Sequence, residues 1–194
     1  MPVYTLHGAK PKIHPSAFIH PDAVLIGNVT VGADSSVWPR AVLRADFGDI
    51  RVGERTSIQD GTVLHTTEEW PTEIGDECVV GHNTHLEGCV VEDRCLIGSG
   101  SVTLNRAAVR AGSIVGAQAL VPEGFEVPPG SMALGVPVRI VRTLDNTPWI
   151  DYGVGEYLSA RRRYNEEMAP VPLDECRTAD LTGPAPDSDQ TTIS

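Results

Sequence analysis

The stretch Ile74–Leu86, with the sequence IGDECVVGHNTHL, carries two series of residues that each repeat at every sixth position. One series is aliphatic and the other is small: Ile74, Val80 and Leu86 for the first, Cys78 and Thr84 for the second. Three faces of six residues make a triangular turn of roughly 18 residues, in which each face points one aliphatic and one small side chain inward. The stretch therefore predicts part of a coil whose interior is filled by stacked aliphatic side chains.

The same period extends over most of the chain. The aliphatic series continues at Ile13, Ile19, Leu25, Val31, Val37, Leu43, Val52, Ile58 and Leu64 before this stretch, and at Val91, Ile97, Thr103, Val109, Val115, Val121, Val127 and Ala133 after it. A small insertion at 47–49 and a loop at 66–73 interrupt the period without ending it. Residues 1–142 therefore predict an all-β domain of about six to seven turns, the left-handed parallel β-helix typical of hexapeptide-repeat proteins.

The pattern changes after the coil. Residues 143–169 predict a C-terminal α-helix, from about Pro148 to Met168, that packs along the outside of the β-helix. Its apolar stripe comprises Ile150, Val154, Tyr157 and Leu158. The run Arg161–Arg163 is expected on a solvated or subunit-facing surface of this helix. Residues 170–194 are rich in Pro, Asp, Ser and Thr and predict a disordered tail.

Charge and composition exclude several classes of partner. The formal net charge of −11 argues against nucleic acid and anionic membranes. No segment approaches the roughly 20 apolar residues that span a bilayer, and the N-terminus has no basic stretch before an apolar run, so we expect no signal peptide. The four cysteines form no C-x-x-C pair, which is typical of reduced thiols in a cytoplasmic protein, and Cys78 and Cys95 fall in the small inward series.

Three outward side chains are expected to meet on one face of the coil. Successive strand residues point to opposite sides, so an inward Leu86 turns His85 and Glu87 outward. The loop lengthens this turn to 22 residues, so that Leu86 stacks on Leu64. Glu87 is therefore expected about 5 Å above His65.

His82 lies two residues after an inward position, near a corner of the coil. Its side chain should reach away from its own face, and in a trimer of such coils it could meet His65 and Glu87 of a neighbouring subunit. Imidazole and carboxylate groups both bind divalent metal ions, so their convergence on one groove between subunits favours a metal site.

Four stretches resemble the γ-class carbonic anhydrase family: LRADFGDI (Leu43–Ile50), IQDGTVLH (Ile58–His65), IGDECVVGH (Ile74–His82) and LIGSGS (Leu96–Ser101). The resemblance covers about Ile13–Arg142. It implies a homotrimer with one metal ion at each subunit interface, usually zinc (Zn²⁺), with iron (Fe²⁺) or cobalt (Co²⁺) as alternatives. By position, His65 and His82 match two of the three histidine ligands of that family.

The sequence departs from the family at the third ligand, where Glu87 stands in place of a histidine. Three interpretations stay open. Glu87 ligates the metal and completes a His₂Glu set, which is known for catalytic zinc. Alternatively, His85 takes the place of the missing ligand, or the site is weak or empty in a non-catalytic relative.

The resemblance also assigns roles to polar residues near this site. The candidate catalytic residues are Gln59, Arg44, Asp46 and Asp60. Gln59 resembles the side chain that orients a metal-bound hydroxide, and the other three resemble groups that form salt bridges between subunits. Phe47 occupies the place of an acidic proton shuttle, for which Glu68 and Glu69 in the loop could substitute.

Three functions follow from these residues. In the leading hypothesis the protein is a lyase, in which the metal lowers the pKa of bound water towards about 7 and the hydroxide reversibly hydrates carbon dioxide. In the second it is an acyltransferase or thioesterase acting on a coenzyme A (CoA) thioester, with His85 or His82 as general base. In the third it is a non-catalytic trimeric protein that binds a small molecule.

Overall fold

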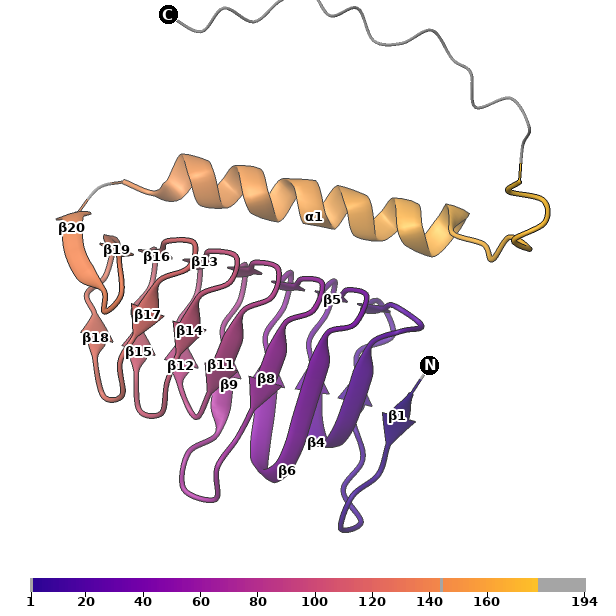
Figure 1. The fold of residues 1–194 in the computed structure, drawn as a ribbon, viewed down its shortest axis with the longest axis horizontal. Coiled ribbons are helices and arrows are strands. Elements are labelled where there is room, and N and C mark those ends of the chain that lie inside the picture. Colours follow the sequence, from indigo (N-terminus) through magenta and orange to yellow (C-terminus); the bar gives the residue numbers. More distant parts are fainter. Residues whose placement is uncertain (1, 144, 178–194) are drawn as a thin grey trace, which may run out of the picture.

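The structure, a computed structural model, describes residues 2–143 and 145–177. These residues form a left-handed parallel β-helix of stacked turns, with a single long helix along one side (Figure 1). The predicted fold class is confirmed. Each turn contributes strands to three faces, and the faces differ in what covers them.

The first face is an eight-stranded sheet, in which seven parallel strands mark seven turns of the coil. In order they are β3 (Phe18–Ile19), β5 (Ser36–Val37), β7 (Ser57–Ile58), β10 (Val79–Val80), β13 (Leu96–Ile97), β16 (Ile114–Val115) and β19 (Ser131–Leu134). The eighth strand, β20 (Arg139–Thr143), pairs antiparallel with β19 and closes that end of the coil.

The other two faces form one 12-stranded sheet, because β4 (Val24–Val31) and β6 (Val42–Val52) run around a corner and belong to both. The second face adds β8 (Val63–His65), β11 (His85–Glu87), β14 (Val102–Thr103) and β17 (Leu120–Val121). The third face adds β2 (Lys12–Ile13), β9 (Thr72–Ile74), β12 (Val90–Val91), β15 (Ala108–Val109) and β18 (Glu126–Val127). β1 (Val3–Tyr4) pairs with β4 at the N-terminal end.

The interior of the coil confirms the predicted aliphatic series. From Leu25 to Ala133, every position of that series is at most 3% exposed. The register stacks these positions directly, since Val80 pairs with Ile58 on one side and with Ile97 on the other. Because neighbouring strands lie only about 4.8 Å apart, like side chains touch at every turn and build one continuous core.

The small series lies at the corners, where successive turns approach most closely. The buried hydroxyl of Thr62 donates to the carbonyl oxygen of Gly81 in the next turn, at 2.8 Å. Gly81 itself has no room for a side chain, since a Cβ there would lie 2.8 Å from the carbonyl oxygen of Ile97. Small side chains at these positions therefore both fit the corner and satisfy buried backbone groups.

Both predicted interruptions of the period are present. The register between β4 and β6 shifts after the Gly27 and Ala45 pair, so β6 holds the inserted residues as a bulge. The loop is shorter than predicted and comprises residues 66–71, because β9 begins at Thr72. Thr72 remains in the strand because it is buried, and its hydroxyl accepts a hydrogen bond from the Gly88 N–H at 2.8 Å.

The C-terminal helix, α1 (Thr147–Glu167), matches the prediction to within one residue at each end. Ile150 and Val154 are buried against the first face, and Tyr157 and Leu158 are half-buried beside them. The predicted apolar stripe is therefore the surface by which α1 packs on the coil.

The prediction that the run Arg161–Arg163 lies on a solvated or subunit-facing surface is wrong for Arg161. It is only 9% exposed, and it donates to the Ser16 carbonyl oxygen at 2.6 Å and to the Asp34 carboxylate at 2.9 Å. The reason is its spacing: Arg161 follows Val154 by seven residues, so it lies two turns further along the same buried stripe. Arg162 and Arg163 are exposed.

Of the predicted tail, residues 170–177 are exposed and include a turn, whereas residues 178–194 lie outside the described residues. The disordered tail therefore stays a prediction. Along the part of the chain that the structure describes, no helix is long and apolar enough to cross a membrane.

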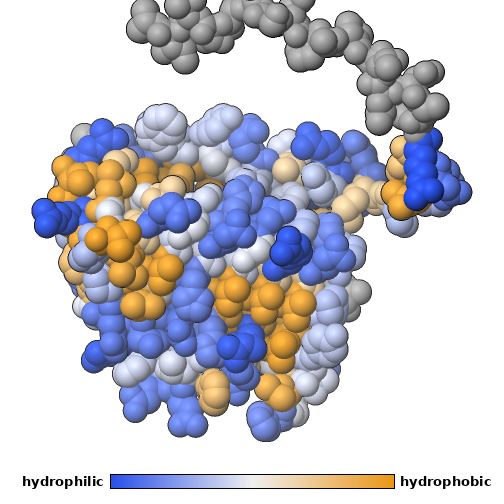
Figure 2. All heavy atoms as spheres, viewed as in Figure 1, coloured by the Kyte–Doolittle hydropathy of each residue, from blue (hydrophilic) through white to orange (hydrophobic). Residues whose placement is uncertain are grey.

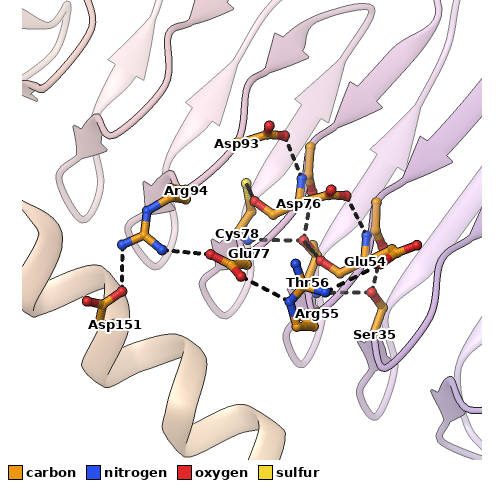
Figure 3. Close-up of polar contacts among 12 residues, drawn as sticks. Ser35, Glu54, Arg55, Thr56, Asp76, Glu77, Cys78, Asp93, Arg94 and Asp151 are labelled. Carbon is orange, nitrogen blue, oxygen red and sulfur yellow. Dashed lines mark hydrogen bonds and ion pairs between the residues drawn. The ribbon is translucent and has the colours of Figure 1, made fainter.

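Charged corner residues tie neighbouring turns to one another and to α1 (Figure 3). Glu77 accepts hydrogen bonds from Arg55 of the preceding turn at 3.0 Å and from Arg94 of the following turn at 2.6 Å. Arg94 also donates to Asp151 of α1 at 2.5 Å. The ion pairs with Arg94 and Arg55 outweigh the burial of Glu77 and lower its pKa, so Glu77 is ionised at neutral pH.

Candidate active site

His65 is held between two carboxylates. It ends β8, points outward and pairs in register with Glu87 of β11 in the next turn, as predicted. Its Nδ1 lies 2.8 Å from Glu87 Oε1, and its Nε2 lies 3.0 Å from Asp46 Oδ1. Both ring nitrogens of His65 therefore lie within hydrogen-bond distance of a carboxylate oxygen.

Glu87 bridges His65 to His85. Its second oxygen, Oε2, lies 3.3 Å from Nε2 of His85, which points outward from the same strand. The side chain of His85 is 37% exposed, whereas that of His65 is 13% exposed. Burial would raise the pKa of Glu87, but hydrogen bonds from His65 and His85 outweigh it and lower the pKa, so Glu87 is charged at neutral pH.

Arg44 supports the other side of this cluster. Its guanidinium is ion-paired with Asp46 through the oxygen that His65 does not use. Burial would raise the pKa of Asp46, but the hydrogen bond from Arg44 and the contact with His65 lower it. Basic and acidic side chains therefore alternate along Arg44, Asp46, His65 and Glu87, and each carboxylate contacts at least one basic side chain.

A cleft of about 480 Å³ opens beside the cluster. It is lined by Phe47, His65, Glu87 and the loop residues 66–70. Two hydrogen bonds of 3.2 Å between Thr67 and Trp70 close this loop, and the guanidinium of Arg106 lies 5.2 Å from the Trp70 ring centroid. The loop wall of the cleft is therefore held by contacts to itself and to a later turn.

Apolar side chains lie above and below His85 on the outer surface of the second face. In register with it are Val42, Val63, Val102 and Leu120, all half-buried. Apolar patches also interrupt the polar surface of the coil in Figure 2. A polar group set among apolar neighbours favours a surface that contacts a ligand or another subunit. The homotrimer itself stays a prediction.

The remaining predicted site residues lie elsewhere in the chain. His82 occupies the corner between β10 and β11, and its Nδ1 lies 3.0 Å from Asp60 Oδ2 beside a separate hollow. Gln59 is 3% exposed and follows β7 on the first face, the face that α1 covers. A single chain thus brings together Arg44, Asp46, His65, His85 and Glu87 but leaves apart His82, Asp60 and Gln59.

One chain does not form the predicted metal site. Among residues 2–143 and 145–177, no three His, Cys, Asp or Glu side chains converge so that they could hold a metal ion. His65 uses both ring nitrogens on carboxylates, and His82 is bonded to Asp60. The residues of a single chain therefore do not fit the zinc ion, and ligation across a subunit interface stays a prediction.

Neither Trp70 nor Arg106 was predicted as a site residue from the sequence. Trp70 directly follows Glu68 and Glu69, and an aromatic residue inside an insertion was a signal that could have identified it. Arg106 gave no such signal, because it reaches Trp70 from a later turn of the coil.

Comparisons with known proteins agree with this fold. The profile of a family described as bacterial transferase hexapeptide (six repeats) matches residues 10–45 and 71–105. The carnitine operon protein CaiE of Escherichia coli K12 is 37% identical over 159 residues, which is 81% of each chain. A hexapeptide transferase family protein from Anaplasma phagocytophilum is 32% identical, with a TM-score of 0.81 over 84% of this chain and 98% of that one.

A third relative was solved with a ligand. It is a hexapeptide-repeat acetyltransferase from Vibrio cholerae in complex with acetyl-CoA. It is 28% identical to this chain, with a TM-score of 0.52 over 59% of this chain and 70% of that one.

Proposed function

This chain belongs to the bacterial transferase hexapeptide family, and from that premise we propose that it transfers an acyl group from a CoA thioester to a small-molecule acceptor. The observation that carries the proposal is the bridge from His85 through Glu87 to His65 beside the cleft. The likeness to an acetyltransferase solved with acetyl-CoA supports the choice of donor.

His85 is the general base in this proposal. A carboxylate bonded to Nε2 holds that nitrogen in its N–H form, which leaves the lone pair on Nδ1 to accept a proton. The side chain is 37% exposed, so an acceptor can approach it. Proton removal by an imidazole oriented in this way contributes about 10²- to 10⁴-fold to the rate.

His65 has a different role, although it lies closer to the cleft. Both of its ring nitrogens already contact carboxylate oxygens, so neither nitrogen is free to contact an acceptor. Its contact through Nδ1 instead fixes Glu87, and Glu87 in turn fixes His85. His65 is therefore a positioning residue.

Acyl transfer from the CoA thioester needs no further reactant, because His85 both accepts and returns the proton. The acceptor hydroxyl or amine gives its proton to His85 Nδ1 as its oxygen or nitrogen attacks the thioester carbonyl carbon. The tetrahedral intermediate then expels the sulfur, and the proton passes from His85 to the leaving thiolate. The products are the acylated acceptor and free CoA thiol. With water as acceptor the same step is thioester hydrolysis.

The hydratase hypothesis is a separate prediction. It needs His65, His82 and Glu87 on one metal ion, which requires His82 of a neighbouring copy and the release of a carboxylate from His65. In the acyl-transfer proposal the same carboxylates stay in place. The arrangement within one chain therefore favours acyl transfer.

The test is release of CoA thiol from acetyl-CoA with a panel of amine and alcohol acceptors, comparing the wild type with His85→Gln. We expect His85→Gln to lower kcat by about 10²-fold or more, because the base is lost. His14→Gln, an exposed histidine away from the cleft, is the matched control and should keep full activity.

Unchanged turnover in His85→Gln would overturn the assignment of the base. Elemental analysis of the same samples separates the competing hypothesis. Near one zinc or iron ion per chain, together with hydration of carbon dioxide and no thiol release, would replace acyl transfer by the hydratase function.

A further inference from the structure

We infer that the acceptor bound in the cleft carries an organic ammonium group. As a statement about the acceptor this rests on the proposed function, but the binding itself can be measured without any acyl transfer. The charge of the cleft, its aromatic side chains and its size all suit such a group.

The cleft has a negative lining. Glu68, Glu69 and Glu87 face it, and none of its described lining residues is Lys or Arg. His65 also lines the cleft, and its two ring nitrogens already contact carboxylate oxygens at 2.8 and 3.0 Å. Opposite charges attract most strongly where the surroundings are partly desolvated, so the cleft favours a cation.

Two aromatic rings accompany these carboxylates. Phe47 is 57% exposed, which costs free energy in water, and its ring stands edge-on to His65 with centroids 6.0 Å apart. Trp70 is held in the loop by Thr67 and by Arg106. An aromatic face attracts an alkylated ammonium ion, whose charge is spread over carbon-bound hydrogens.

The combination distinguishes an organic cation from a metal ion. Aromatic rings supply no donor atoms for a hydrated metal ion, and no group of metal-binding side chains converges among the described residues. The cleft volume of about 480 Å³ falls within the usual range for a small organic ligand. An alkylammonium group uses both kinds of lining, because it is apolar and charged at once.

The negative lining also restricts the donor. CoA carries phosphate groups, which the exposed carboxylates of Glu68 and Glu69 would repel. Its nucleotide end must therefore lie outside this cleft, with only the thioester reaching His85. This leaves the space between Phe47 and Trp70 to the acceptor.

The probe is choline, compared with its neutral carbon isostere 3,3-dimethyl-1-butanol, titrated into the full-length protein. Binding is followed by NMR at the indole N–H of Trp70, assigned with Trp70→Phe. We expect choline to shift this resonance with an affinity about fivefold or more above that of the alcohol, because only choline carries the charge.

The double variant Glu68→Gln/Glu69→Gln tests the lining. Both side chains are exposed, and we expect choline to bind it about fivefold or more weakly. Glu156→Gln, an exposed glutamate on α1, is the matched control and should leave the affinity unchanged. Equal affinities for choline and the alcohol, no binding of choline, or an unchanged affinity in the double variant would overturn the inference.

Different results would exclude the acyl-transfer function and the ammonium site. Transfer of acetyl groups to a neutral alcohol without any binding of choline would remove the inference and keep the proposed function. Choline binding with the expected variant effects, but without thiol release from acetyl-CoA, would remove the function and keep an ammonium site.

Discussion

At the scale of single residues, Glu87 has a geometry that a histidine could not reproduce. A carboxylate has two oxygens, and each reaches a different imidazole, at 2.8 Å for His65 and 3.3 Å for His85. An imidazole at this position would face two other imidazoles. Where the γ-class pattern has a histidine, this chain therefore has a carboxylate that bridges two histidines.

Replacing Glu87 with histidine is expected to favour metal binding. The change frees His65 Nδ1 from its carboxylate and supplies a third neutral imidazole of the kind that the γ-class resemblance implies. We expect Glu87→His protein, purified without chelator, to contain more zinc per chain than the wild type by elemental analysis. Glu156→His on α1 is the control, and equal zinc contents in the wild type and Glu87→His would contradict the expectation.

At the scale of elements, α1 is fixed to the coil by aromatic rings and by one buried arginine. Trp38 of the coil packs edge-on against Tyr157 and Tyr164 of α1, with ring centroids 5.9 and 5.0 Å apart. Arg161 donates to the first turns of the coil at Ser16. These contacts cover the first face and leave the second face, with His85, open.

Arg161→Ala should destabilise the protein, because it leaves the Ser16 carbonyl and Asp34 without their charged donor. Loss of hydrogen bonds from a charged, buried group costs about 2 kcal/mol. Urea unfolding measures the loss. Arg162→Ala, an exposed neighbour, should change the free energy of unfolding by less than about 0.5 kcal/mol. Equal stabilities of the two variants would show that the buried contacts do not hold α1.

At the scale of the whole molecule, each turn contacts mainly the turns next to it. Stability is then roughly a sum of contacts between neighbours, as in other solenoids. Besides the aliphatic stack, corner ion pairs link the turns, such as Arg55 with Glu77, Glu77 with Arg94, and Arg110 with Glu92. The Arg94 to Asp151 pair extends this link to α1.

These pairs predict the response to acid. Ion pairs with Arg94 and Arg55 lower the pKa of Glu77 below its ordinary value of 4.5, so its contribution to stability is complete above pH 4.5 and is lost as the pH falls further. We expect Glu77→Gln to be less stable than the wild type by about 1 kcal/mol at pH 7 and by less at pH 3.5. Urea unfolding at the two pH values measures this, and a difference independent of pH would refute it.

The sequence predicted those features of the fold and the site that depend only on the six-residue repeat. A coil that buries one side chain every six residues fixes which positions point inward, and counting 22 residues from Leu64 to Leu86 was enough to place Glu87 beside His65. It did not predict the second carboxylate on His65, because that contact depends on how β6 bulges at Asp46.

Contacts between distant segments of the chain could not be predicted from the six-residue repeat either. Arg161 reaches Ser16 and Asp34 only because α1 runs back along the coil towards its first turns. Arg106 meets Trp70 only because the loop folds over towards a later turn. Neither contact follows from a repeat of six residues.

On the first face, the reversal of the chain at β20 ends the ladder of parallel strands. Parallel strands about 4.8 Å apart with like side chains in register are also the geometry of cross-β fibrils, whose open ends template the next copy. Here β20 runs antiparallel to β19, with a shift of register between Met132 and Ala133. A second chain that approached the first face at this end would meet a strand of the opposite direction, so this ladder of seven parallel strands offers no parallel edge there for a further copy to extend.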